Sequence, residues 1–237
     1  MPRLQFTDLI IHEDDDYIVI NKPSFVATLE DRNDPISILS LARDYAADVQ
    51  IGHRLDKETS GALAIAKHPE AYRALAIQFE QRQVDKTYHA VSEGVHDFRD
   101  VTVDLPILAT RKGVVRISRR EGKPAQTLVN TLEVYQRHTL IKCQPITGRM
   151  HQIRIHLASL EASIVGDEQY GGHPFYLSEI KRDYHLKKNT EEQPLIKRVA
   201  LHAAALGFAG MDGRPIAVAA PYPKDFAVLL KQLDKNK

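Results

Sequence analysis

His53-Arg54-Leu55-Asp56-Lys57-Glu58-Thr59-Ser60-Gly61 stands immediately before the apolar run 62–66. A polar stretch that ends in glycine and is followed by an apolar run predicts a loop leading into a buried strand. Asp56 then becomes a carboxylate at the edge of regular structure. Three basic side chains surround it, which favours its ionised form and attracts an anionic substrate. On these residues alone, a solvated turn is the commoner role of such a loop.

The overall composition is that of an ordinary globular protein. A chain of 237 residues can form one substantial domain or two small ones. Its net charge is only +1, so an RNA site would have to arise from an uneven distribution of charge. The single cysteine, Cys143, cannot form an internal disulfide, which is typical of a reducing compartment. With neither an apolar leader nor a run of membrane-spanning length, the sequence predicts a cytoplasmic protein without membrane association.

Apolar spacing predicts many short strands with a few helices between them. The expected strands are 10–11, 17–20, 62–66, 87–91, 101–103, 114–117, 128–132, 140–143, 201–208 and 216–219. Helices are expected at 35–46, from Pro69 onward, and at 224–233. Residues 151–160 are ambiguous, because their isoleucines alternate as in a strand and their leucines recur as in a helix. We favour the helix, which would place His151 and Arg154 on one face.

Two basic stretches are candidate RNA contacts. The first consists of Arg111, Lys112, Arg116, Arg119, Arg120 and Lys123, relieved only by Glu121. It is either a mobile hairpin or a set of phosphate contacts, and its lack of aromatic residues favours backbone electrostatics over base stacking. The second, 173–198, is polar and basic and reads as a surface insertion. A partly ordered loop and an RNA-gripping arm are equally good interpretations of it.

Four motifs, taken together, resemble those of one family. Residues 53–61 resemble the central motif of the RluA family of pseudouridine synthases. Asn21-Lys22-Pro23, Lys86-Thr87-Tyr88 and residues 147–156 resemble three further motifs, in the family's order. One departure stands out, because Phe25 occupies a position where family members usually carry glycine. The local turn after Pro23 is therefore open to question.

The resemblance implies a fold and an activity. It implies a single α+β catalytic domain over 1–237, with a mixed, largely antiparallel sheet, flanking helices and the insertion at 173–198. The S4 RNA-binding module that many relatives carry before the first motif is expected to be absent. The implied reaction converts uridine in ribosomal or transfer RNA to pseudouridine. It needs no cofactor and no metal, and a monomer is expected.

The resemblance also implies roles for individual residues. Asp56 would attack the sugar or remove a sugar proton, Arg154 would pair with Asp56, and Tyr88 would lie against the uracil. Arg54 could fill the space that a flipped nucleotide leaves. The residues expected to bind substrate are His53, Arg54, Leu55, Arg149, His151, Gln152 and Leu201.

Two other classes of protein compete with this interpretation. One is a catalytically silent RNA-binding or RNA-folding protein that keeps the same cleft. The other is a metal-dependent hydrolase that uses some of the eleven histidines. His151 and His156 are not spaced four apart and have no cysteine or acidic partner nearby in sequence, which argues against a metal.

Overall fold

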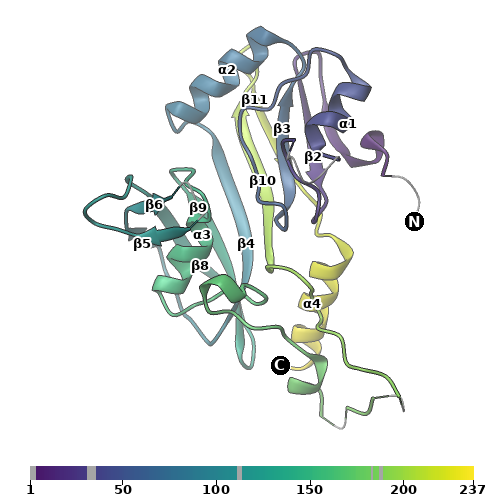
Figure 1. The fold of residues 1–237 in the computed structure, drawn as a ribbon, viewed down its shortest axis with the longest axis vertical. Helices are drawn as coiled ribbons and strands as arrows, with labels where there is room; N and C mark the ends of the chain where they lie inside the picture. Colours follow the sequence, from purple (N-terminus) through teal and green to yellow (C-terminus); the bar gives the residue numbers. More distant parts are fainter. Residues whose placement is uncertain (1–3, 31–35, 111–113, 183, 187–188) are drawn as a thin grey trace. The chain divides into compact units, whose positions relative to one another are not determined.

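The described part of the chain divides into two compact units. The computed structural model describes residues 4–30, 36–110, 114–182, 184–186 and 189–237. The first unit comprises Met1–Tyr88 and His202–Tyr222, and the second comprises His89–Leu201 and Pro223–Lys237 (Figure 1). The single domain expected over 1–237 stays a prediction.

The first unit contains a mixed sheet. Its strands are β1 (Ile10–Glu13), β2 (Tyr17–Lys22), β3 (Ser60–Ala66), β10 (Leu201–Ala209) and β11 (Pro215–Ala219). They follow the order β1-β2-β3-β10, and β11 pairs with β10. β3 and β10 are parallel, whereas the other pairs are antiparallel. All five strands expected in these regions are confirmed.

Helices α1 (Ile38–Tyr45) and α2 (Pro69–Glu80) pack on opposite faces of this sheet (Figure 1). Side chains alternate along a strand, so Ile18 and Ile20 of β2 face α1 while Tyr17 and Val19 belong to the cluster around α2. On β3, leucine and isoleucine lie on the α1 face and alanines on the α2 face. β3 is buried throughout because both of its faces are covered.

Each helix begins at a capping residue. Ser37 Oγ accepts the N–H of Ser40 at 3.0 Å, and Ser40 Oγ accepts the N–H of Ser37 at 2.9 Å, forming a capping box. α1 therefore begins at Ile38, three residues later than expected, and residue 35 lies outside the described residues. His68 caps α2 through Ala71, and Pro69 opens that helix as expected.

The second unit is built on antiparallel pairs and two helices. Its elements are β5 (Val101–Asp104), β6 (Ile107–Ala109), β7 (Val115–Ile117), β8 (Gln126–Val134), β9 (His138–Pro145), α3 (Gln152–Ser159) and α4 (Lys224–Lys235). β5, β8 and β9 are neighbours in that order, and β6 pairs with β7. β4 (Asp85–Glu93) begins in the first unit and ends in the second. β6 was not predicted, because three residues are too few to show a period.

The ambiguous segment after residue 150 is a helix, as favoured. Ile155 of α3 packs with Ile107 and Val115 of the β6–β7 hairpin. Ile153 and Leu157, one turn apart on the helix, are buried as well, which explains the helical part of the apolar pattern. His151 precedes the helix with a φ of 52°.

Residues 173–198 are mostly irregular, but their two ends are buried. Phe175 packs on the ring of His138, with ring centroids 4.1 Å apart. Arg198 is bonded to Asp225 of α4. The exposed basic residues Lys181, Arg182 and Lys197 lie between these anchors, and Lys187 and Lys188 lie outside the described residues. In the described segments, no helix is both long and apolar enough to cross a membrane.

Candidate active site

The backbone of the Asp56 loop is held by a neighbouring threonine. Thr28 Oγ1 donates to the carbonyl of Leu55 at 2.8 Å and accepts the N–H of Leu55 at 3.2 Å. The N–H of Thr59 donates to the carbonyl of Asp56 at 3.1 Å, closing a turn around this residue. The half-buried carboxylate of Asp56 therefore extends from a backbone whose hydrogen bonds are made within the protein.

A buried lysine links the Asn21-Lys22-Pro23 motif to the same loop. Lys22 has no exposed surface. Its ammonium donates to the carbonyls of Pro23, Val26 and Lys57 at 2.9, 2.8 and 3.2 Å. A buried charge needs such partners, because otherwise its lost hydration is not replaced. Sequence reasoning did not find this role, and its only local signal was a lysine at the end of an apolar strand.

Phe25 keeps the turn that glycine usually makes. Its φ is 66°, in the left-handed region, and its N–H donates to the carbonyl of Lys57 at 2.8 Å. A bulky residue pays about 1–2 kcal/mol for that conformation. Phe25 therefore has a backbone conformation that glycine adopts without strain, and its side chain is 52% exposed.

His53 is a neutral hydrogen-bond acceptor. Its Nε2 accepts the N–H of Ala64 on β3 at 2.9 Å, and its ring stacks on Phe79 with centroids 4.4 Å apart. Burial, and then the charge of Lys86, lower the pKa of His53 to about 3. The imidazole is thus uncharged at neutral pH and ties the start of the loop to the strand that follows it.

The other residues expected near Asp56 differ in exposure. Arg54 is exposed, while Leu55 is 4% exposed and belongs to the core cluster beneath α1. Tyr88 lies on β4, as expected, and packs against the same cluster. Burial, and then the negative charge of Asp56, raise the pKa of Tyr88 above its ordinary value. Asp56 and Tyr88 are thus brought together within the first unit, and the tyrosine hydroxyl stays protonated at neutral pH.

A buried serine–histidine pair holds the end of the loop. Ser60 Oγ lies 2.9 Å from His202 Nδ1, and His202 Nε2 lies 3.1 Å from the carbonyl of Ala220. Nε2 must donate to that carbonyl, so Nδ1 accepts the serine proton. Gly61 has a φ of 116°, and a Cβ there would meet the Ala203 carbonyl oxygen. Ser60 and His202 are far apart in the chain, so no local pattern could have paired them.

Arg154 is held in the second unit by three side chains. Its Nε and Nη2 donate to the two carboxylate oxygens of Asp167 at 2.7 and 2.6 Å. Nη2 also donates to Gln169 Oε1 at 3.3 Å, and the guanidinium carbon lies 5.0 Å from the centroid of the Tyr170 ring. Asp167 is 1% exposed. Asp167 was not among the residues predicted for the site, because no local pattern links it to Arg154.

The turn before α3 is fastened by Gln152. Its Oε1 accepts from Thr147 Oγ1 at 2.7 Å and from the N–H of Arg149 at 2.9 Å. Its Nε2 donates to the carbonyl of Gln126 at 2.9 Å and to Thr127 Oγ1 at 3.0 Å. The buried amide thereby joins the turn to β8.

Three further predicted residues lie in the second unit. His151 Nδ1 lies 2.9 Å from the hydroxyl of Tyr170. Arg149 Nε donates to the carbonyl of Pro124 at 3.1 Å. Leu201 is buried at the start of β10, and its carbonyl accepts from Arg198. Arg154 belongs to this unit and Asp56 to the first, so their pairing stays a prediction.

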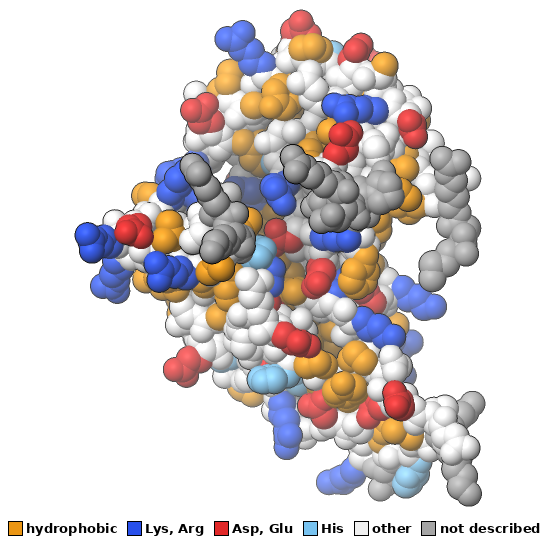
Figure 2. Space-filling model, in the orientation of Figure 1, with side chains coloured by type: hydrophobic (Ala, Val, Ile, Leu, Met, Phe, Trp, Pro, Cys, Tyr) orange, Lys and Arg blue, Asp and Glu red, His pale blue; other side chains and the backbone are white. Residues whose placement is uncertain are grey.

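Exposed basic residues gather at the β6–β7 hairpin. Figure 2 shows Lys and Arg side chains, in blue, at the left of the view, which is where Figure 1 shows this hairpin. The exposed members of the predicted stretch are Arg116, Arg119, Arg120 and Lys123. Arg111 and Lys112 lie outside the described residues. Across the described ranges, no group of three or more His, Cys, Asp or Glu side chains is arranged to hold a metal ion.

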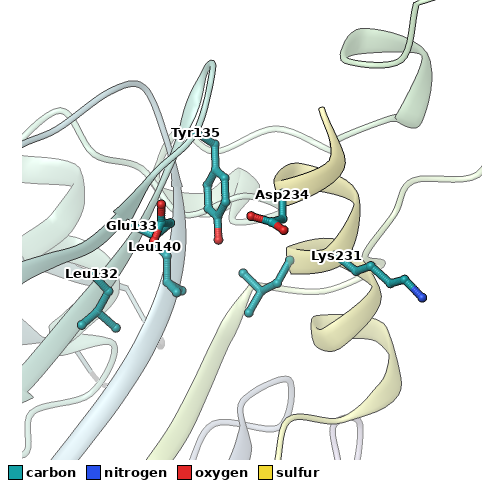
Figure 3. A pocket seen from close by; sticks show the side chains of 7 residues that line it. Leu132, Glu133, Tyr135, Leu140, Lys231 and Asp234 are labelled. Atoms are coloured by element: carbon teal, nitrogen blue, oxygen red, sulfur yellow. The ribbon is translucent and has the colours of Figure 1, made fainter. Parts of the chain in front are cut away.

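A cavity of about 560 Å³ in the second unit involves none of the predicted site residues (Figure 3). It lies between the β8–β9 hairpin and α4, and its lining comprises Leu132, Glu133, Tyr135, Leu140, Leu230, Lys231 and Asp234. Lys237 Nζ bonds Glu133 and Asp234 at 2.9 and 2.8 Å. These carboxylates are therefore engaged by the chain's own ammonium.

Comparison with known proteins gives a consistent family. Residues 16–159 match the RNA pseudouridylate synthase family model. The chain is 35% identical to ribosomal large subunit pseudouridine synthase C of Salmonella typhi, over 98% of this chain and 73% of that protein. It is 34% identical to ribosomal large subunit pseudouridine synthase D of Haemophilus influenzae, over 94% and 70%.

A solved structure agrees with the sequence matches. Human RNA pseudouridylate synthase domain containing 4 superposes with a TM-score of 0.74 at 25% identity, covering 97% of this chain and 94% of that one. The α+β fold with a mixed, mostly antiparallel sheet is thereby confirmed, as is the resemblance drawn from the motifs. The chain belongs to the RNA pseudouridylate synthase family and is an RNA pseudouridine synthase, an isomerase.

Proposed function

We propose that this chain converts specific uridines of large-subunit ribosomal RNA to pseudouridine, with Asp56 as the catalytic carboxylate. The RNA class follows the relatives, which are named as ribosomal large subunit enzymes. The observation that supports the catalytic assignment most strongly is the pairing of Asp56 with Tyr88 in one unit, on a loop whose backbone is held by Thr28 and Lys22. We further expect a monomer in the cytoplasm, without membrane attachment.

The reaction defines what Asp56 has to do. The bond between uracil N1 and ribose C1′ breaks, the uracil turns, and a bond from C5 to C1′ forms. C5 loses a proton and N1 gains one, so no oxidant, reductant or energy donor is required. An ionised carboxylate can attack the sugar carbon, or it can remove a sugar proton to give a glycal. Asp56 is assigned to one of these two roles.

Tyr88 supplies an aromatic ring beside the Asp56 loop. Because it packs against the cluster that contains Leu55, we assign it to stacking on the uracil and keeping the detached base in place. A tyrosine on a strand beside an apolar cluster also helps to exclude water from a reactive intermediate.

Arg154 is assigned to pairing with Asp56 in the working enzyme. Asp167 takes the side of the guanidinium formed by Nε and Nη2, which sets the plane of the group. An arginine held in this way can meet a second carboxylate without first losing side-chain entropy. Asp167 is therefore proposed as a positioning residue that acts through Arg154.

The exposed basic residues are assigned to contacts with the RNA itself. A uridine within structured RNA must be flipped outward, at a cost of about a few kcal/mol. Exposed Arg54 could occupy the vacated space. Phosphate contacts from the β6–β7 hairpin, and from Lys181 and Arg182, would offset the cost through counterion release. Binding should then weaken steeply with added salt.

Two measurements test this function. Pseudouridine is mapped across all cellular RNA with and without the gene, and D56N is assayed on a large-subunit rRNA transcript, which contains no pseudouridine. D56N should lose several orders of magnitude in rate because no other carboxylate replaces the catalytic oxygen. D44N, at an exposed position on α1, is the matched control and should retain full activity.

Each competing function predicts a different result. A silent RNA-binding protein would bind the transcript and leave every uridine unchanged, with D56N no different from wild type in cells. A metal-dependent hydrolase would lose activity with a chelator. Unchanged pseudouridine at every rRNA position after gene deletion would overturn the proposed substrate.

A further inference from the structure

Phe25 combines a strained backbone conformation with an exposed aromatic side chain. Its backbone is in the left-handed region at a φ of 66°. Its side chain is 52% exposed, so the apolar ring contributes little hydrophobic stabilisation to the fold. Bulky residues rarely hold this conformation, and such outliers concentrate at functional sites. A glycine would make the same turn without strain.

The position of Phe25 connects it to the Asp56 loop. Its N–H donates to the carbonyl of Lys57, the residue that follows Asp56. The ammonium of Lys22 bonds the same carbonyl and those of Pro23 and Val26, on either side of Phe25. The turn that carries the ring is therefore fastened at its backbone, and its side chain is presented to solvent from the edge of the catalytic loop.

We propose that Phe25 stacks on an unpaired nucleobase of the RNA, next to the target uridine. The inference rests on the proposed function, because it takes RNA to be what approaches the Asp56 loop. Every nucleobase offers a flat π-face, and exposed aromatic rings on a fixed backbone are the usual platform for single-stranded RNA. The basic hairpin lacks aromatic residues, so its arginines and lysines would bind RNA through charge. Phe25 would add base stacking.

A tryptophan reporter tests contact directly. The chain contains no tryptophan, so F25W creates a single tryptophan whose fluorescence can be excited selectively. I77W is the matched control, because Ile77 is 42% exposed on α2, a helix that packs on the opposite face of the sheet from Leu55. Titration with a twelve-nucleotide single-stranded RNA of mixed sequence should quench F25W and leave I77W unchanged. Equal quenching of both, or of neither, would overturn the proposal.

Substitutions separate stacking from folding. F25G removes the ring and also relieves the backbone, so its Tm should equal or exceed that of wild type. Its KM for the rRNA transcript should rise about 5- to 150-fold, as expected for loss of one stacked base, with kcat little changed. F25L should show the same rise in KM as F25G, and F25W should have the KM of wild type. A KM for F25G within twofold of wild type, or full rescue by F25L, would show that no base stacks there.

The activity assay and the fluorescence titration distinguish the Phe25 proposal from the proposed function on which it rests. If wild type leaves the rRNA transcript unmodified, the proposed substrate is wrong, yet the fluorescence titration still tests Phe25 against RNA. If F25G modifies the transcript with the KM of wild type, the proposed function stands and the Phe25 assignment fails. Quenching of F25W by a protein and not by RNA would assign this surface to a protein partner, which also contradicts the proposal.

Discussion

The second unit contains two arginine–aspartate pairs with nearly the same hydrogen bonds and different surroundings, since the side chain of Asp167 is 1% exposed and that of Asp225 is 33% exposed. In both, Nε and Nη2 donate to the two oxygens of one carboxylate. Those distances are 2.7 and 2.6 Å for Arg154–Asp167, and 2.7 and 3.1 Å for Arg198–Asp225. Arg198 also donates through Nη1 to the carbonyls of Val199 and Leu201 at 3.1 Å each. The Arg198 pair thus joins an irregular backbone segment to α4.

Arg154 is held in a different way. The carbon of its guanidinium lies over the Tyr170 ring, and Asp167 and Gln169 both accept from Nη2. These contacts link α3 to the turn at Asp167 through side chains alone, whereas Arg198 also donates to two backbone carbonyls. Under the proposed function, the Arg154 pair aims a charge and the Arg198 pair is a structural link.

The largest effect should come from replacing each arginine by lysine. Lysine keeps the charge but cannot donate two parallel bonds to one carboxylate. R154K should lose at least about a hundredfold in kcat on an rRNA transcript, because a misplaced catalytic charge costs that much, while its Tm changes less than that of R198K. R198K should lose about 1–3 kcal/mol of unfolding free energy, measured with urea, because lysine cannot replace all the hydrogen bonds that Arg198 makes to Asp225 and to two backbone carbonyls. Equal effects of both variants on kcat would remove the distinction.

Replacing each aspartate by asparagine should give smaller effects, on kcat for one pair and on Tm for the other. D167N keeps the shape of the side chain but no longer anchors Arg154, so kcat should fall about ten- to a hundredfold with KM little changed. D225N should lower the Tm and leave kcat close to wild type below that temperature. In an R154A background, D167N should have no further effect on kcat. A further loss there would show that Asp167 acts independently of Arg154.

The smallest effect concerns acid stability. Burial raises the pKa of Asp225, but hydrogen bonds from Arg198 and the N–H of Phe226 outweigh it, so the folded pKa is lowered. A lowered carboxyl pKa stabilises the fold above the unfolded value, near 4, and this contribution is lost as pH falls through the folded value. D225N should therefore flatten the stability curve below about pH 4.

His53, in the first unit, should give a second pH dependence of stability, which can be compared with that of Asp225. Its pKa of about 3 means that the unfolded chain takes up a proton that the folded chain does not. Stability should fall as pH drops from about 6.5 toward 3. H53Q keeps an acceptor for Ala64 and should reduce that slope, to which His89, His138 and His156 also contribute through their lowered pKa values, whereas D225N should leave the slope intact. A common response of both variants over the whole range would contradict these assignments.

Local patterns predicted the main elements well. Alternation in β2, the run in β3 and the proline at the start of α2 each depend on neighbouring residues, so they can be read without a partner. The Asp56 loop and Tyr88 were found in the same way, through their motifs. β6 was missed because it is too short to show a pattern, and the start of α1 was misplaced because a serine capping box, and not a proline, begins it.

The sequence by itself determined the strands, the helices and the family, because hydrophobic periodicity and motif order are properties of nearby residues. Only the tertiary structure decided that Lys22 bonds three carbonyls, that Ser60 meets His202, and that Asp167 holds Arg154. Those contacts join groups that are distant in the chain or belong to the backbone. Their free energy depends on burial and geometry, which a list of residue types does not contain.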